Sequence, residues 1–198
     1  MQAEFSVEIG PDDHCLEIPW ASGDGGLRYF DLKNQPELLL EITETHDNRE
    51  LAEFLAAVNQ PNSQLETAKC DTWLTDELDV EDEIFGVPLK FGSYVDLIFS
   101  DPAQRLSFEK HEEFARSLAA LLRKAPDFAA AAELVLRRCY YHRSEDLDLD
   151  QSDSGFYLTL YLYGYGDDED GAKKSWVIGL KLLQNALLQV TSQARRQG

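Results

Sequence analysis

Tyrosines at alternate positions form the pattern in this chain that best suits a binding role. The residues concerned are Tyr157, Tyr161, Tyr163 and Tyr165. Because neighbouring side chains of a β-strand point to opposite faces, this spacing places all four rings on one face. A phenol combines a large apolar ring with a polar hydroxyl, and tyrosine is enriched at protein interfaces. We predict that this tyrosine face binds a protein partner; the structural alternative is burial beneath the chain's own helices or strands.

A run of aspartates at positions 146, 148 and 150 has the residue type and spacing of a calcium site. Carboxylates at alternate positions begin the loops that wrap this hard cation. Further along, however, Gln151 stands where such a loop needs glycine, and Tyr157 stands where it needs a bidentate glutamate. We therefore predict no metal site here.

A second metal-type pair is Cys139 and His142, three residues apart in a segment that we expect to be helical. That spacing would bring a thiol and an imidazole to one helix face, but a zinc site needs three or four ligands. Together with Phe128 and Val135 the two residues fit a packed helix face better. We predict no cofactor.

Nucleophilic catalysis and phosphate binding lack their local signatures. The chain has no Gly-x-Ser-x-Gly segment, and its glycine-rich segment 23–26 lacks both the lysine and the spacing of a phosphate loop. Carboxylates are too abundant in so acidic a chain for any one pair to identify an acid–base site. We name no catalytic residue, and keep a carboxylate-based hydrolase, with or without a divalent cation, as the enzymatic alternative.

The net charge of −19 is concentrated in two segments. Residues 41–83 contain thirteen acidic and two basic residues, and residues 145–170 contain nine acidic residues and no basic one. A surface of this kind repels nucleic acids and anionic membranes, so we expect neither as a partner. A basic protein partner, a cation or simple solubility would each fit the charge.

The elements that position the tyrosines are the best defined in the chain. Leucines alternate with the tyrosines from Phe156 onward, which gives a strand with two distinct faces. After an acidic turn at 167–170 comes a helix with an apolar stripe, formed by Trp176, Leu180, Leu183, Leu187, Val190 and Ala194. The acidic turn suits the positive N-terminal end of that helix. A strand and a helix that each have one apolar side predict two packed layers.

The remaining elements follow from periodicity, capping residues and turn residues. Further strands are predicted over residues 4–9, 14–20, 27–32, 64–74 and 87–100. Residues 37–45 are ambiguous: Pro36 could open a helix, but Ile42, Thr43 and Thr45 favour a strand, which we predict here. Helices are predicted over residues 48–59, 102–123 and 127–143. The polar run 75–83 is expected to be a solvated loop or a short exposed helical turn.

Together these elements predict a single α+β domain over residues 1–198, with amphipathic helices packed on one face of a mainly antiparallel sheet. No apolar run approaches the roughly 20 residues that cross a bilayer, and the first residues lack the features of a signal peptide. The odd number of dispersed cysteines (Cys15, Cys70 and Cys139) indicates reduced thiols. We therefore expect a cytoplasmic, non-enzymatic protein-binding module, of the inhibitor or immunity type; a homodimer formed through the tyrosine face is a third hypothesis.

Overall fold

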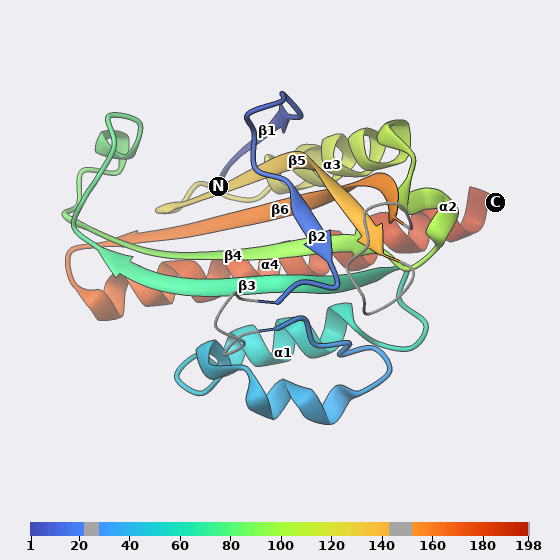
Figure 1. Cartoon of the computed structure of the whole chain (residues 1–198). Coiled ribbons are helices and arrows are strands. Elements are labelled where there is room, and N and C mark those ends of the chain that lie inside the picture. Colours follow the sequence, from blue (N-terminus) through green and yellow to red (C-terminus); the bar gives the residue numbers. More distant parts are fainter. Residues whose placement is uncertain (22–27, 143–151, 198) are drawn as a thin grey trace.

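A mixed β-sheet with helices on one of its faces organises the computed structural model of the chain (Figure 1). The structure describes residues 1–21, 28–142 and 152–197. Its strands are β1 (Gln2–Glu8), β2 (Leu16–Ile18), β3 (Leu65–Thr75), β4 (Leu89–Phe99), β5 (Ala130–His142) and β6 (Ser152–Gly166). Its α-helices are α1 (Arg49–Val58), α2 (Pro102–Arg105), α3 (Phe108–Leu122) and α4 (Glu169–Gln197), and its 3-10 helices are η1 (Pro36–Glu41), η2 (Thr43–Thr45) and η3 (Asp82–Phe85).

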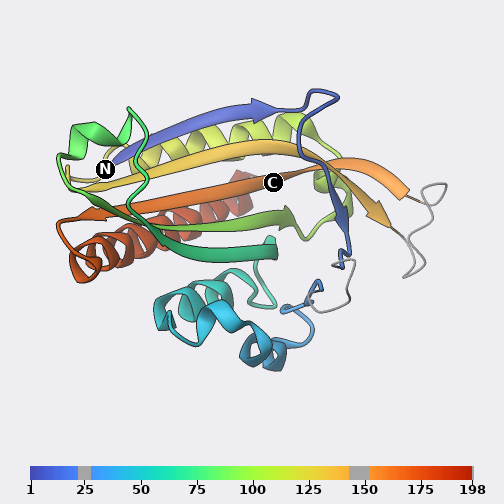
Figure 2. The same cartoon turned by 60° about the vertical axis from the view of Figure 1, so that its left-hand side comes forward.

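The strands lie in the order β1-β5-β6-β4-β3, and the short β2 continues beside β5 beyond the end of β1. Pairings between β3, β4, β6 and β5 are antiparallel, whereas β1 and β2 both run parallel to β5. Helices α3 and α4 lie along one face of the sheet, and α1 packs at its β3 edge (Figures 1 and 2). The predicted class, an α+β fold with a mainly antiparallel sheet and helices on one face, is confirmed.

The central strand β6 has the two faces that the alternating pattern predicted. Its residues Leu158, Leu160 and Leu162 are buried in the main core beneath α4, and the tyrosines point to the opposite face. Glycine is required where α4 comes closest: a Cβ on Gly164 would lie 2.1 Å from the backbone nitrogen of Trp176. This close approach lets Trp176 reach full burial and donate an indole hydrogen bond to Ser93 Oγ, 2.8 Å away on β4.

The prediction of a helix over 127–143 is wrong, because residues 130–142 form β5. Alanines at 129–132 favour a helix, but pairing with β1 on one side and β6 on the other overrides that weak local preference. In a strand, residues three apart point to opposite faces. Cys139 therefore lies on the sheet face opposite the helices while His142 lies on the helix-covered face, so the two side chains do not share the single face that a helix would have given them.

Other departures concern the N-terminal half. Residues 37–45, predicted as a strand, form η1 and η2, and the predicted strand 27–32 is reduced to one isolated bridge between Arg28 and Ala21. The predicted helix 102–123 is divided, since Ser107 caps a new helix by accepting a hydrogen bond from the Lys110 amide. The aspartates at 146, 148 and 150 lie outside the described residues. Among the helices that are described, none is long and apolar enough to cross a membrane.

Candidate functional site

The sheet face opposite the helices is covered at its two ends and open between them. At one end the chain from β1 through β2 to Trp20 crosses the face, and at the other the segment between β3 and β4 folds over it with η3 (Figure 2). We call the uncovered middle part the open face. Register places its side chains in rows that run across β1, β5, β6, β4 and β3.

The β2 end of this face is a small second core. It consists of Leu16, Ile18, Ala68, Ile98, Cys139, Tyr141 and Tyr157, with Trp20 and Tyr29 against it. Trp20 fastens the covering segment by donating its indole hydrogen bond to the Ala68 carbonyl at 2.7 Å. The predicted site residue Tyr157 is 1% exposed in this core, with its hydroxyl 3.1 Å from His14 Nδ1.

The opposite end is held by a buried ion pair. Lys90 donates to Asp82 at 2.6 Å, and Tyr165 donates its hydroxyl to the same carboxylate at 2.6 Å. Burial alone would raise the pKa of Asp82, but these two hydrogen bonds, a third from the Asp79 backbone and the charge of Lys90 together hold the pKa below its usual value. The Phe85 ring stacks on Tyr165 at 4.0 Å between centroids. The predicted site residue Tyr165 is therefore also buried. The segment 75–83, which we expected to be exposed to solvent, contains the buried Asp82.

Tyr161 and Tyr163, the other two predicted site residues, lie between these ends and are half-buried. Their rings are stacked with centroids 6.2 Å apart. Tyr94 lies 6.0 Å from Tyr161, and Trp73 lies 6.2 Å from Tyr163, with its indole over Gly92. We call these four half-buried rings the aromatic cluster. Sequence reasoning grouped only the two that share β6, because Trp73 and Tyr94 come from other strands.

A cavity of about 210 Å³ lies beside the aromatic cluster, and Asp96 lines it from β4. This carboxyl is 5% exposed, and its Oδ1 accepts a hydrogen bond from Thr159 at 2.6 Å. Burial raises the pKa of Asp96 to about 6, against the lowering effects of the Thr159 hydrogen bond, Arg137 and Lys69. We call this space the Asp96 cavity.

Arg137 organises the same cavity from β5. Its guanidinium pairs with Glu8 at 2.7 Å and donates to Thr159 Oγ1 at 3.0 Å and to the Tyr161 hydroxyl at 3.1 Å. Thr159 thus accepts from Arg137 while it donates to Asp96. This chain of contacts fixes the ring of Tyr161 and the carboxylate of Asp96 relative to each other.

A larger space of about 410 Å³, the acidic pocket, lies on the other side of the cluster. The pocket is lined by one basic residue, Lys90, and by five acidic residues: Glu4, Asp79, Glu81, Asp82 and Glu133. Burial first, and then the neighbouring carboxylates of Glu8 and Glu4, raise the pKa of Glu133, although Arg137 acts against them. Tyr163 and Tyr165 supply an aromatic wall. Negative charge and aromatic surface therefore meet at this point of the open face.

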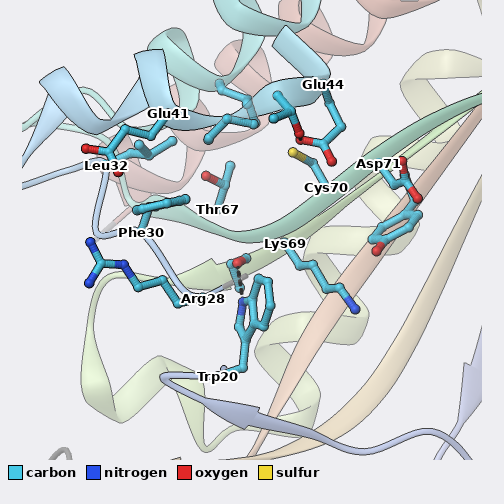
Figure 3. Close-up of a pocket in the computed structure, with 15 residues that line it drawn as sticks. Trp20, Arg28, Phe30, Leu32, Glu41, Glu44, Thr67, Lys69, Cys70 and Asp71 are labelled. Atoms are coloured by element: carbon cyan, nitrogen blue, oxygen red, sulfur yellow. Dashed lines mark hydrogen bonds between the residues drawn. The ribbon is translucent and has the colours of Figure 1, made fainter. Parts of the chain in front are cut away.

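A third pocket, of about 240 Å³, lies between the outer side of β3 and the η1–η2 segment (Figure 3). In Figure 3, Phe30 and Leu32 lie on the same side of β3 as Thr67 and Cys70, and Trp20 lies across the strand from them. Lys69 and Tyr94 line both this pocket and the Asp96 cavity, so the two spaces are neighbours. Burial raises the pKa of Cys70 to about 12, which leaves the thiol protonated and unreactive.

The pockets do not assemble a recognisable catalytic or metal centre. In the Asp96 cavity one carboxylate accompanies His14, and the acidic pocket contains carboxylates but none of the described histidines. Within residues 1–21, 28–142 and 152–197, no three potential ligands are grouped to hold a metal ion. The carboxylates and rings that line these pockets can bind cations and aromatic or polar groups, which suits ligand or protein binding. Sequence reasoning missed Asp96 and Arg137; an acid inside the apolar strand 94–99 was the available signal for Asp96.

No protein-family model, no curated protein and no solved structure matches this chain.

Proposed function

We propose that the protein is a non-enzymatic binding module that receives a basic segment of a partner protein on the open face. The observation that carries this proposal is the aromatic cluster, which stays half-buried while the helices cover the other side of the sheet. Four adjoining rings offer a large apolar contact surface at little cost in side-chain entropy.

Charge favours a basic partner for this surface. The acidic pocket adjoins Tyr163, and lysine or arginine side chains are attracted to carboxylates and to the faces of tyrosine and tryptophan rings. The net charge of −19 would in addition speed the encounter with a positively charged protein. We expect the rings to supply most of the affinity and the carboxylates to supply orientation and rate.

A test uses three labelled dodecapeptides with alternating Arg-Ala, Lys-Ala and Glu-Ala sequences, followed by fluorescence anisotropy at 150 mM salt. We expect the basic peptides to bind and the acidic one not to bind. Tyr161→Ala combined with Tyr163→Ala should weaken binding at least tenfold. Tyr140→Ala is the matched control, because Tyr140 is exposed but lies on β5 with its side chain on the opposite face. Equal affinity of the double variant and the natural protein would mean diffuse attraction to the acidic surface, and would refute the proposal.

The homodimer hypothesis uses the same rings and makes a different prediction. If the aromatic cluster joins two copies of the chain, light scattering will report a dimer that the double variant converts to a monomer. If the natural protein is monomeric at high concentration, the face is free for another protein.

A further inference from the structure

The Asp96 cavity contains a buried carboxylate with an unused oxygen. Asp96 Oδ1 accepts from Thr159, whereas Oδ2 accepts no hydrogen bond from the residues that the structure describes and keeps contact with solvent in the cavity. Arg137 and Lys69 act on this carboxylate through their charges, but neither forms an ion pair with it within the described residues, so a ligand can supply a direct partner for Oδ2. Asp96 is 5% exposed and lines the cavity, so the natural occupant would place a positively charged donor there.

Lys69 supplies the opposite charge to the same space without neutralising Asp96. The two residues are register partners on β3 and β4, at a bulge of β3, and the charge of Lys69 lowers the pKa of Asp96, yet no ion pair within 4.0 Å joins them in the described structure. The Lys69 ammonium lies instead over the Trp20 ring, 5.2 Å from its centroid. Directly opposite residues on one sheet face normally interact. Here a positive and a negative group both border the cavity and remain apart.

The other charged and titratable groups of the cavity are already engaged. Arg137 is paired with Glu8, and burial first, followed by Arg137 and Lys69, lowers the pKa of His14, so that its imidazole is neutral. The Nδ1 atom of His14 meets the Tyr157 hydroxyl at 3.1 Å. Rings of Tyr94, Tyr157 and Tyr161 line the rest of the space and suit an ammonium group.

From this arrangement we infer that the Asp96 cavity binds a small zwitterion of the α-amino acid class. Its ammonium group would contact Asp96 Oδ2, and its carboxylate would contact Lys69 at the half-buried side of the cavity. A ligand with a positive group alone would leave Lys69 without a counter-charge, and one with a negative group alone would leave Asp96 without one, whereas a zwitterion pairs with both. The volume of about 210 Å³ equals roughly seven water molecules at about 30 Å³ each, enough for a free amino acid.

The Asp96 cavity shares Tyr94 and Tyr161 with the aromatic cluster, but amino acid binding and peptide binding can be tested separately. Glu4 and Glu81 are exposed and line the acidic pocket but not the Asp96 cavity. Glu4→Gln combined with Glu81→Gln should therefore weaken the basic peptides and leave amino acid binding unchanged, so either idea can fail without the other.

The test is a thermal-shift screen of the twenty common α-amino acids at 5 mM, followed by calorimetry with the best of them. We expect at least one to bind, and we expect its N-acetyl and its carboxamide derivatives each to bind at least tenfold more weakly. Asp96→Asn and Lys69→Met should each lose at least tenfold in affinity. Lys181→Met, an exposed lysine on α4, is the control and should bind as the natural protein does.

Two results would overturn the inference. One is that no amino acid binds at millimolar concentration to the natural protein. The other is that Asp96→Asn, shown by circular dichroism to be folded, binds the best amino acid with unchanged affinity.

Discussion

Replacing Asp96 with asparagine should make the protein more stable at neutral and alkaline pH. Burial raises the pKa of this carboxyl from 3.8 to about 6. A difference of about 2 in pKa corresponds to about 3 kcal/mol between the two protonation states. Since the native pKa is the higher one, the folded state holds the proton more tightly than the unfolded state does. The free energy of unfolding therefore falls as pH rises from about 4 to about 6, and the loss is complete above that range.

Asparagine keeps the size of the side chain and an oxygen that can accept from Thr159, but it carries no charge. The hydrogen bond to a neutral oxygen is weaker by about 1 kcal/mol than one to a carboxylate. We therefore expect Asp96→Asn to raise the free energy of unfolding by about 1–3 kcal/mol at pH 8. At pH 4, where the native carboxyl is already protonated, the difference should be close to zero.

Urea unfolding followed by tryptophan fluorescence at pH 4, 5, 6, 7 and 8 measures both quantities. Asp71→Asn is the control for the general effect of removing one negative charge, because Asp71 is exposed on the neighbouring strand β3. The reasoning fails if Asp96→Asn is less stable than the natural protein at pH 8. It also fails if the stability difference is the same at pH 4 as at pH 8.

Three further predictions concern packing, the buried ion pair and the thiols. Gly164→Ala should lower the free energy of unfolding, measured with urea, by about 1–3 kcal/mol, because the added Cβ would lie 2.1 Å from the α4 backbone. An unchanged urea midpoint would contradict this packing. Lys90→Met should cost about 3–5 kcal/mol, since it leaves the Asp82 carboxylate buried without its cation, and a loss below 1 kcal/mol would show that the pair is dispensable. Cys15 is exposed, whereas Cys139 is fully buried with a pKa raised by burial to about 12, so a thiol reagent should modify Cys15 in the native protein and Cys139 only in denaturant.

The strand–helix unit could be predicted from the sequence because each of its elements has one strongly apolar side. The leucines of β6 face α4, and Trp176 and Leu180 face β6, so both periodicities were visible. β5 has apolar residues on both faces: Leu134 and Leu136 lie in the main core, while Val135 and Cys139 lie on the other side. Burial on both faces hides the period of two, and the alanines then favour the helical interpretation.

The candidate site depends on strand register, which a single sequence does not reveal. Tyr94 is opposite Tyr161, and Asp96 is opposite both Thr159 on one neighbouring strand and Lys69 on the other. These residues are tens of positions apart in the chain. The sequence could place Tyr161 and Tyr163 on one face, but not the segments that bury Tyr157 and Tyr165, because those covers come from the N-terminal crossover and the η3 segment. The binding role of the tyrosine face stays a prediction.

The position of β6 determines when the molecule can fold during its synthesis. Before this strand is made, the chain can form the β3–β4 hairpin and the pairing of β1 with β5, but within the described sheet no strand pairing joins these two halves. Residues 152–166 then insert between β4 and β5 and pair with both at once. A nascent chain that stops short of them has unpaired strand edges in the middle of its sheet, which are prone to aggregate. Folding of this sheet on the ribosome must therefore wait until residues 152–166 have been translated.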